Sequence, residues 1–296
     1  MIGDYKMKFE PMSQRETTLD HYGKRGISWH GFCLQFYLLK CEKSDDGEDA
    51  KVTSKYTVYL DQVVSDGNKQ DALSVYSLLD AALGQVANEM PFVSSIILQT
   101  DNAKCYNNTF LLCAIPLLNI TYQQDRLSIT AFIHTETQDG KTILDTHFAR
   151  MTKFVRQFMS SCVDNEVRKI NTSGTLGYAL YHSGGVKNVG VQVVNTNNAV
   201  TKNIEEKFET VTKVLKTYFT RVNHAYFYPP DKANTEGQSY SGVLLASDII
   251  DTMVFNIRVQ SYSNRIVNFH IDMTKSGKNI VNKNQIMNEK LTQRKQ

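Results

Sequence analysis

The segment from Phe92 to Asp101 constrains the fold of this chain more than any other. Residues 92–98 are apolar and rich in Val and Ile, with only two serines between them, which is typical of an inner strand covered on both faces. At the carboxyl end of such a strand the side chains open into a crevice, the usual ligand site of an α/β sheet. Because the run ends on Asp101 and Asn102, we expect either a ligand site or a simple chain turn there.

Composition narrows the class of protein. A chain of 296 residues, 41% of them hydrophobic, has room for one large domain or two ordinary ones around a real core. The net charge of +3 is too small to indicate a nucleic-acid-binding protein by itself. Residues 275–296 are basic, and we interpret them as a solvated end or as a contact for phosphates.

The cysteines and the apolar runs indicate in which cellular compartment the protein is expected. The five cysteines form no C-x-x-C pair, so nothing in their spacing supports a zinc ribbon or a thioredoxin-like site. We therefore expect reduced cysteines in an intracellular protein. The sequence contains no apolar run long enough to cross a bilayer and no charged-then-apolar leader after Met1, so no membrane partner is expected.

Strand-like and helix-like patterns follow one another along the chain. The predicted strands are 26–40, 56–64, 92–98, 127–134, 189–194, 253–260 and 265–271, and the predicted helices are 69–89, 142–160 and 201–223. The first two strands should form an antiparallel hairpin around the acidic loop 42–49, and Asp66 to Asn68 offer caps for the first helix.

This order of elements predicts an α/β fold. Antiparallel strands followed by strands joined through helices indicate a mixed sheet flanked by helices. Beyond it, a long amphipathic helix and a β-hairpin indicate a smaller α+β region at the C-terminus. We therefore predict a core of residues 1–195 and a C-terminal region of residues 196–296 with a basic tail.

Three carboxylates stand at positions where an α/β sheet places a site. Asp4 lies in the first strand-like segment, Asp101 ends an inner strand, and Asp145 begins the helix that follows the next strand. Oxygen ligands of this kind suit Mg²⁺, and a pair of such ions stabilises the attacking and leaving oxygens of a phosphodiester reaction. For Asp145 the alternative is a capping role with Thr142, three residues before it.

Several motifs carry a resemblance to a known family. They are DYKMKF at 4–9, RE at 15–16, YGKRGISWH at 22–30, QD at 70–71, DNAKCY at 101–106 and GKTILD at 140–145. In this order they resemble a family of uncharacterised eukaryotic proteins similar to transposon-derived DDE-type transposases. The resemblance runs from the first residues to about Val194, and more weakly to the hairpin near Ile271.

The resemblance implies a ribonuclease-H-like fold with a two-metal site. In that arrangement Asp4 is the carboxylate of the first strand, Asp101 the one after the fourth strand, and Asp145 the acid of the following helix. Mg²⁺ or Mn²⁺ would be the cofactor and nucleic acid, expected to be DNA, the partner, with cleavage or strand transfer as the reaction in the nucleus. Glu136 and Asp139 compete with Asp145 for the third position, and Lys104 and Lys141 are candidates for holding substrate phosphates or are ordinary solvated lysines.

Two departures from this pattern open an alternative. Only three residues precede Asp4, fewer than a first strand with a central Asp needs, which suggests a fragment. The sequence also shows no zinc-finger or other DNA-reading module. The alternative function is a decayed or domesticated transposase domain that binds DNA or protein without cutting, and a purely structural protein remains a third possibility.

Other residues that carry reactive groups have simpler interpretations. His30 follows a tryptophan on a predicted strand, with no second ligand at metal spacing, and is expected to be packed. His134, His147 and His182 lack a positioned nucleophile. Tyr226 and Tyr228 have side chains that stack on bases in some proteins, although packing within the second half is the simpler role.

Overall fold

The computed structural model describes residues 1–13, 25–43, 49–65, 68–135, 143–161, 169–196, 199–216, 222–228, 254–261, 266–272 and 281–284. The chain divides into two compact units, each built from two separate segments. The first unit comprises Met1–Gln70 and Gln138–Thr196, and the second comprises Asp71–Thr137 and Asn197–Gln296. The predicted division into residues 1–195 and 196–296 stays a prediction.

The first unit contains a sheet with the strand order β1-β3-β4-β8 and a short pair, β2-β7. β3 is antiparallel to both β1 and β4, whereas β8 runs parallel to β4. The elements are β1 (Ile2–Phe9), β2 (Met12–Ser13), β3 (Ile27–Lys43), β4 (Asp49–Ser65), α4 (Ile143–Ser161), β7 (Lys169–Ile170), α5 (Ser173–Tyr181), the 3₁₀ turn η1 (His182–Gly184) and β8 (Val189–Asn195).

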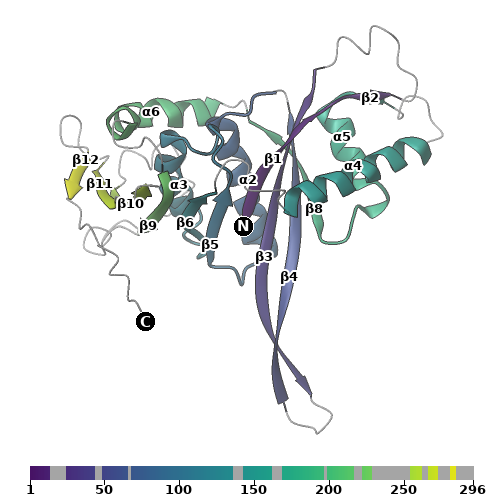
Figure 1. Cartoon of the computed structure of the whole chain (residues 1–296), viewed down its shortest axis with the longest axis horizontal. Helices are drawn as coiled ribbons and strands as arrows, with labels where there is room; N and C mark the ends of the chain where they lie inside the picture. The colour runs from purple at the N-terminus through teal and green to yellow at the C-terminus, as the bar shows by residue number, and fades with distance from the viewer. Residues whose placement is uncertain are drawn as a thin grey trace, which may run out of the picture. The chain divides into compact units, whose positions relative to one another are not determined.

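The predicted hairpin of β3 and β4 is confirmed, and it is longer than expected. Pairing continues to Lys43 opposite Asp49, so the predicted loop at 42–49 is too wide, and residues 44–48 lie outside the described residues. β1 pairs with Ile27–Cys33 and β8 with Tyr59–Ser65. Beyond these partners β3 and β4 continue as a two-stranded arm that projects past the other strands of the unit (Figure 1).

One face of this sheet carries the core of the first unit. Trp29, Cys33 and Val63 on the strands pack against apolar residues that recur along α4, from Leu144 to Met159. α5 adds Leu176, Ala179 and Leu180 to the same cluster. The 3.6-residue spacing of the apolar positions on α4 explains why this segment folds as a helix that buries one side.

The second unit contains the strand order β5-β6-β9-β10-β11-β12. β5 and β6 are parallel, and β9 to β12 continue antiparallel from β6. The elements are α2 (Ala72–Glu89), β5 (Ser95–Thr100), α3 (Thr109–Thr121), β6 (Ser128–His134), α6 (Ala199–Lys216), β9 (Val222–Tyr228), β10 (Val254–Ser261), β11 (Ile266–Asp272) and β12 (Val281–Asn284). The predicted hairpin of β10 and β11 is confirmed.

The core of the second unit is centred on α3. Every residue of this helix from Phe110 to Leu118 is buried, because α2, α6 and β6 all pack against it. The ring of Phe110 contacts Tyr76 on α2, with centroids 6.1 Å apart, and Phe208 on α6, with centroids 6.5 Å apart. A helix that is apolar all round needs this kind of enclosure.

Three predictions about local structure were wrong in detail. Asp71, not the Asp66–Asn68 segment, caps α2, since its carboxylate accepts a hydrogen bond from the Ser74 backbone N–H at 2.9 Å. β5 is buried on alternate residues rather than on both faces, and Ile97 is 54% exposed. The helix predicted to reach residue 223 ends at Lys216, and β9 begins at Val222.

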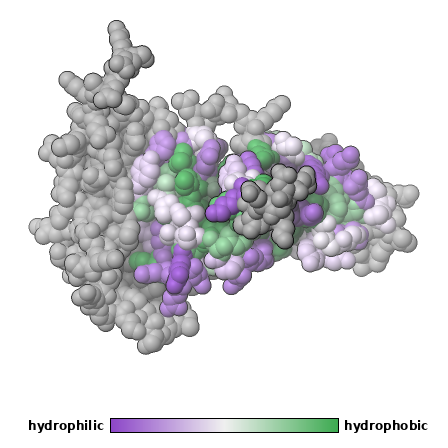
Figure 2. Space-filling view, turned by 90° about the horizontal axis from the view of Figure 1, so that it is seen from below, coloured by the Kyte–Doolittle hydropathy of each residue, from purple (hydrophilic) through white to green (hydrophobic). Residues whose placement is uncertain are grey.

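In the described part of the chain, no helix combines the length and apolarity needed to cross a membrane. Figure 2 shows hydrophobic residues reaching one face of the molecule in patches between hydrophilic ones. Among the exposed large hydrophobic residues are Tyr37 and Leu39 on the two-stranded arm, and Tyr178 and Tyr181 on α5.

Candidate functional site

Asp4 lies on β1, in the sheet of the first unit. It lies opposite Gly31 of β3, and Gly31 in turn lies opposite Asp61 of β4. A Cβ atom on Gly31 would meet Phe148 and Leu144 of α4. Directly opposed residues of antiparallel strands share a face, so Asp4 and Asp61 both lie on the face that α4 covers.

Asp145 belongs to α4, the helix that packs over Gly31, the residue paired with Asp4. It is exposed in the first turn of α4, immediately after Leu144, the residue that packs over Gly31. His147 of the same helix reaches Asp61 on β4. Because Asp145 is about 200° around the helix from His147, it lies on the other flank of α4, toward β1.

A residue near the C-terminal end of α4 supports this rotation of the helix. Arg156 follows Asp145 by about three helical turns and therefore lies on the same flank. Burial, and then the nearby charge of Arg156, lower the pKa of Lys6 on β1. Two of the three predicted carboxylates, Asp4 on β1 and Asp145 on α4, thus belong to the first unit, and α4 contacts β1.

Asp101 belongs to the second unit and directly follows β5. Its side chain is half-buried, and its Oδ1 accepts a hydrogen bond from the Ala103 backbone N–H at 3.1 Å. This is the side-chain turn that Asp makes two residues ahead of itself, so the turn considered from the sequence is present. A carboxylate carries two oxygens and several lone pairs, so this hydrogen bond leaves acceptor capacity for a metal ion.

A buried histidine lies against the Asp101 backbone. The Thr100 hydroxyl donates to the Asp101 carbonyl oxygen at 3.1 Å, and it lies 3.2 Å from Nδ1 of His134 on β6. Since the single hydroxyl hydrogen is used, Thr100 accepts from Nδ1–H of His134, which assigns the tautomer of this ring. Burial lowers the pKa of His134 to about 4. Nothing in the sequence indicated that His134 lies near Asp101, although each residue ends a predicted strand.

Of the remaining predicted site residues, the structure describes only Lys104. Lys104 is exposed in the loop after Asp101. Lys141, Glu136 and Asp139 lie outside the described residues, as does Thr142 of the expected capping pair.

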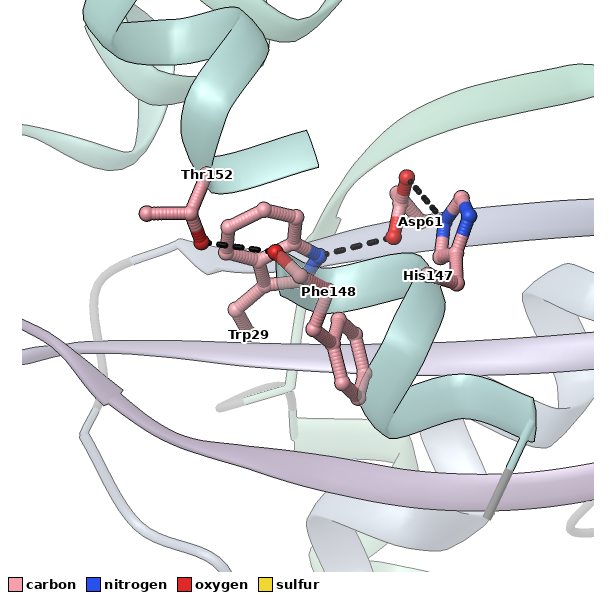
Figure 3. A network of polar contacts seen from close by, with 5 residues as sticks. All are labelled: Trp29, Asp61, His147, Phe148 and Thr152. Carbon is pink, nitrogen blue, oxygen red and sulfur yellow. Dashed lines mark hydrogen bonds and ion pairs between the residues drawn. The ribbon is translucent and has the colours of Figure 1, made fainter. Parts of the chain in front are cut away.

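Sequence reasoning missed a buried polar network under α4 (Figure 3). Asp61 is fully buried, and its Oδ1 accepts from Nε1 of Trp29 at 2.9 Å while its Oδ2 lies 2.9 Å from Nε2 of His147. The His147 ring also stacks on Tyr59, with centroids 4.0 Å apart. The sequence feature that could have indicated this network is Asp61 itself, a carboxylate within the apolar run of a predicted strand. The network ties α4 to β3 and β4.

Over the described ranges, no three His, Cys, Asp or Glu side chains gather within reach of one metal ion. As carboxylates, Asp4, Asp101 and Asp145 each carry the kind of oxygen ligand that Mg²⁺ prefers. Comparisons with known protein families, with curated proteins and with solved structures find no match to this chain.

Proposed function

We propose that this chain is a transposase-derived domain with a ribonuclease-H-like core that cleaves nucleic acid, or transfers its strands, with divalent metal ions. Asp4, Asp101 and Asp145 are the proposed metal-binding and catalytic residues. DNA is the proposed substrate and the nucleus the proposed location.

The order of the elements supports this proposal. Three antiparallel strands, β1, β3 and β4, come first. The helix α2 then leads to two parallel strands, β5 and β6, which are connected by α3. In this order Asp4 lies on the first strand, Asp101 directly follows β5, and Asp145 lies on α4, which follows β6. β1 is a full strand of eight residues with Asp4 as its third, so a strand forms around the first carboxylate.

The observation that carries the proposal is the packing of α4. Leu144 and Phe148 fit over Gly31, the residue paired with Asp4, and the bond of His147 to Asp61 fixes the rotation of the helix. Asp145 consequently lies on the β1 flank of α4.

The roles of the residues follow from their chemistry. The three carboxylates would hold Mg²⁺, which supplies charge to the attacking and leaving oxygens of a phosphodiester. Lys104, exposed beside Asp101, would contact a phosphate oxygen as a point charge, and Lys141 is proposed for the same task.

A nuclease assay with matched variants tests the proposal. The wild type and the variants Asp4→Asn, Asp101→Asn and Asp145→Asn are incubated with labelled DNA and Mn²⁺ or Mg²⁺. We expect metal-dependent cleavage by the wild type and a loss of at least about a hundredfold in each variant, because even residues behind metal ligands contribute 10–100-fold. Asp125→Asn, an exposed acid in the turn after α3, is the control and should retain activity.

The assay also separates the alternative function. If the wild type binds DNA but does not cleave it with either metal, the chain is a binding module descended from a transposase. If all four variants behave alike while remaining folded, the three carboxylates do not form a site.

A further inference from the structure

β8 forms an open edge of the first unit's sheet. It pairs with β4 on one side and with no described strand on the other. The Tyr59 backbone N–H donates to the Asn188 carbonyl oxygen at 2.8 Å, so Asn188 turns its backbone groups toward β4. Because successive residues of a strand turn these groups to opposite sides, the N–H and C=O of Val191 and Val193 point away from β4. Among the residues that the structure describes, these outward groups have no hydrogen-bond partner.

The sequence of β8 lacks the features that protect a sheet edge from pairing. Its 7 residues, VGVQVVN, contain no proline and no charged side chain, and its register with β4 has no bulge. Natural proteins block an exposed edge strand with lysine, proline, a bulge or a very short strand. Since β8 has none of these, a further strand can extend the sheet here.

α5 continues the uncharged surface beside β8. None of its 9 residues is charged, although 21% of the whole chain is. A Cβ atom on Gly177 of α5 would lie 2.6 Å from Cγ2 of Val193, which is 48% exposed. Tyr181, one helical turn after Gly177 and on the same flank, is 64% exposed. The centres of protein interfaces are depleted of charged residues and enriched in tyrosine, so α5 and β8 together have the composition of an interface.

The position of α5 suits a second copy of this chain as the partner. α5 packs on both β8 and β4, so its axis lies above the space between these strands. When two copies pair through β8 in antiparallel order, both α5 helices lie on the same face of the joined sheet. With strands about 4.8 Å apart, the two helix axes are about 10 Å apart, a distance at which helices pack. A lone extended peptide on β8 would leave the exposed flank of α5 uncovered.

The length of β8 selects one register for this pairing. Only a two-fold axis at Gln192, the central residue, places every residue of β8 opposite a residue of the second copy. Val191 then lies opposite Val193 of the second copy, and the two exchange both backbone hydrogen bonds, because their backbone groups point outward. Gln192 lies opposite its own copy, and its amide carries both donors and an acceptor. No pair in this register opposes like charges, which would be destabilising.

We propose that this protein forms a two-fold dimer in which the β8 strands of two copies pair in antiparallel order around Gln192. The sheet of the first unit then continues into the sheet of the second copy, and the two α5 helices pack beside each other. This inference goes beyond the proposed function and does not depend on it.

Sedimentation equilibrium of the full chain, from about 1 to about 100 μM, tests the proposal. We expect a concentration-dependent dimer of the wild type. Val193→Lys should raise the dissociation constant at least about tenfold, because an unpaired charge is costly in an apolar interface. Val191→Pro removes an outward N–H but no hydrogen bond to β4, and it should weaken the dimer as well. Lys187→Ala, a change at an exposed residue before β8, is the control and should leave the dissociation constant unchanged.

Engineered cysteines test the register. Gln192→Cys places two thiols at directly opposed positions with Cα atoms about 4.5 Å apart, which a disulfide can span. It should give a covalent dimer on mild oxidation, above the background of the wild type. Val193→Cys is the matched control and lies at a more exposed position. Its two copies are offset along the strands, with Cα atoms about 8 Å apart, so it should not crosslink.

The outcomes decide between a second copy and another occupant. A wild type that stays monomeric over this concentration range overturns the inference, even if it binds an added extended peptide through β8. Folded Val193→Lys and Val191→Pro variants that dimerise as tightly as the wild type also overturn it. So does crosslinking of Val193→Cys without crosslinking of Gln192→Cys. Should Val193→Lys and Val191→Pro lose their cooperative urea transition, the two cysteine variants decide, because they keep the backbone pairing of β8 with β4.

Discussion

Gly31 lies between two carboxylates in the sheet of the first unit. Asp4 and Asp61 are its partners on either side, and a Cβ at this position would lie 2.9 Å from Cζ of Phe148 and 3.2 Å from Cδ2 of Leu144. Protein interiors are close-packed, so α4 would have to move to make room. The absence of a side chain at position 31 therefore allows α4 to pack closely over β3.

We predict that Gly31→Ala destabilises the protein by about 1–3 kcal/mol through overpacking against α4. The measurement is the urea midpoint of unfolding. Gly174→Ala is the matched control, since the nearest atom to an added Cβ on this α5 residue is 3.9 Å away and Ala is preferred to Gly in helices. Equal midpoints for Gly31→Ala and the wild type would show that α4 does not pack here as described.

Asp61 is the buried acceptor on which the network in Figure 3 depends. Asp61→Ala leaves Nε1 of Trp29 and Nε2 of His147 without their acceptor, and a buried donor without a partner costs about 1–3 kcal/mol. We expect a loss of about 2–4 kcal/mol in the free energy of unfolding, measured with urea. Asp145→Ala, an exposed change on the same helix, should cost no more than about 1 kcal/mol. A loss for Asp61→Ala no larger than that for Asp145→Ala would contradict the network.

His134 makes stability depend on pH. The ordinary pKa of His is 6.5, and burial lowers that of His134 to about 4 in the folded chain. Between these values the unfolded state binds a proton that the folded state does not, so stability falls as the pH drops from about 6.5 to about 4, by up to about 3 kcal/mol. Urea unfolding at several pH values measures this slope.

A variant isolates this contribution. His134→Gln keeps a donor toward Thr100 but cannot take up a proton, so its stability should fall less steeply over the same range. Burial also lowers the pKa of His30 to about 3, and His30→Gln should remove a second part of the slope. A slope in His134→Gln as steep as that of the wild type would rule out His134 as its source.

Helices and strands with strong periodicity were predictable at the scale of elements. The apolar spacing of α4 and the alternation in β10 and β11 each indicate one structure, and the fold contains it. β9 was hidden because it follows the helical pattern of α6 closely. The rotation of α4 was also beyond the sequence, since it depends on Asp61, a residue distant along the chain.

The two-stranded arm is the element most exposed to local opening. Beyond residue 33 of β3 and before residue 59 of β4, the described strands pair only with each other, and isolated hairpins are marginally stable. Phe36 and Tyr56 stack across the arm, with centroids 5.6 Å apart, and Lys40 lies over the Tyr56 ring at 5.4 Å.

We expect Tyr56→Ala to open the arm without unfolding the unit, because the core residues lie elsewhere in the sheet. Hydrogen exchange should accelerate in residues 34–40 and 51–58, while the urea midpoint changes little. Tyr178→Ala, a change at a 62% exposed residue of α5, is the control and should leave exchange in the arm unaltered. If Tyr56→Ala lowers the global midpoint as much as a core substitution, the arm is part of the cooperative unit.

At the scale of the whole molecule, the chain divides into two compact units, with Asp4 and Asp145 in the first and Asp101 in the second. The sequence alone indicated that Asp4 lies in a strand, that Asp101 follows one and that Asp145 begins a helix, and the elements are of these kinds; that the three form one site stays a proposal. It gave no indication that the two units are each built from separate segments. Contacts between residues far apart in the chain decide that partition, and no local pattern records them.

The division of the chain can be tested by truncation. A chain ending at Thr196 lacks α6, whose Phe208 contacts Phe110 and whose Thr201 hydroxyl lies 3.3 Å from that of Ser77. We expect such a fragment to bind a hydrophobic dye and to unfold without a sharp transition, because the apolar surface of α3 loses part of its cover. Phe208→Ala in the full chain should give a weaker form of the same effect. A fragment 1–196 that unfolds cooperatively and ignores the dye would show that residues 1–195 fold independently.

The first unit is built from two separate chain segments, and this affects how it folds while the ribosome synthesises the chain. Its strands β1, β3 and β4 are complete by Ser65, but α4, which covers them, begins only at Ile143. At typical rates of 5–20 residues per second, the ribosome needs roughly 4–16 s to make the intervening chain. During that interval Trp29, Cys33 and Val63 have no α4 to pack against, so the nascent chain is most open to chaperones, and to misassembly, before its middle third is complete.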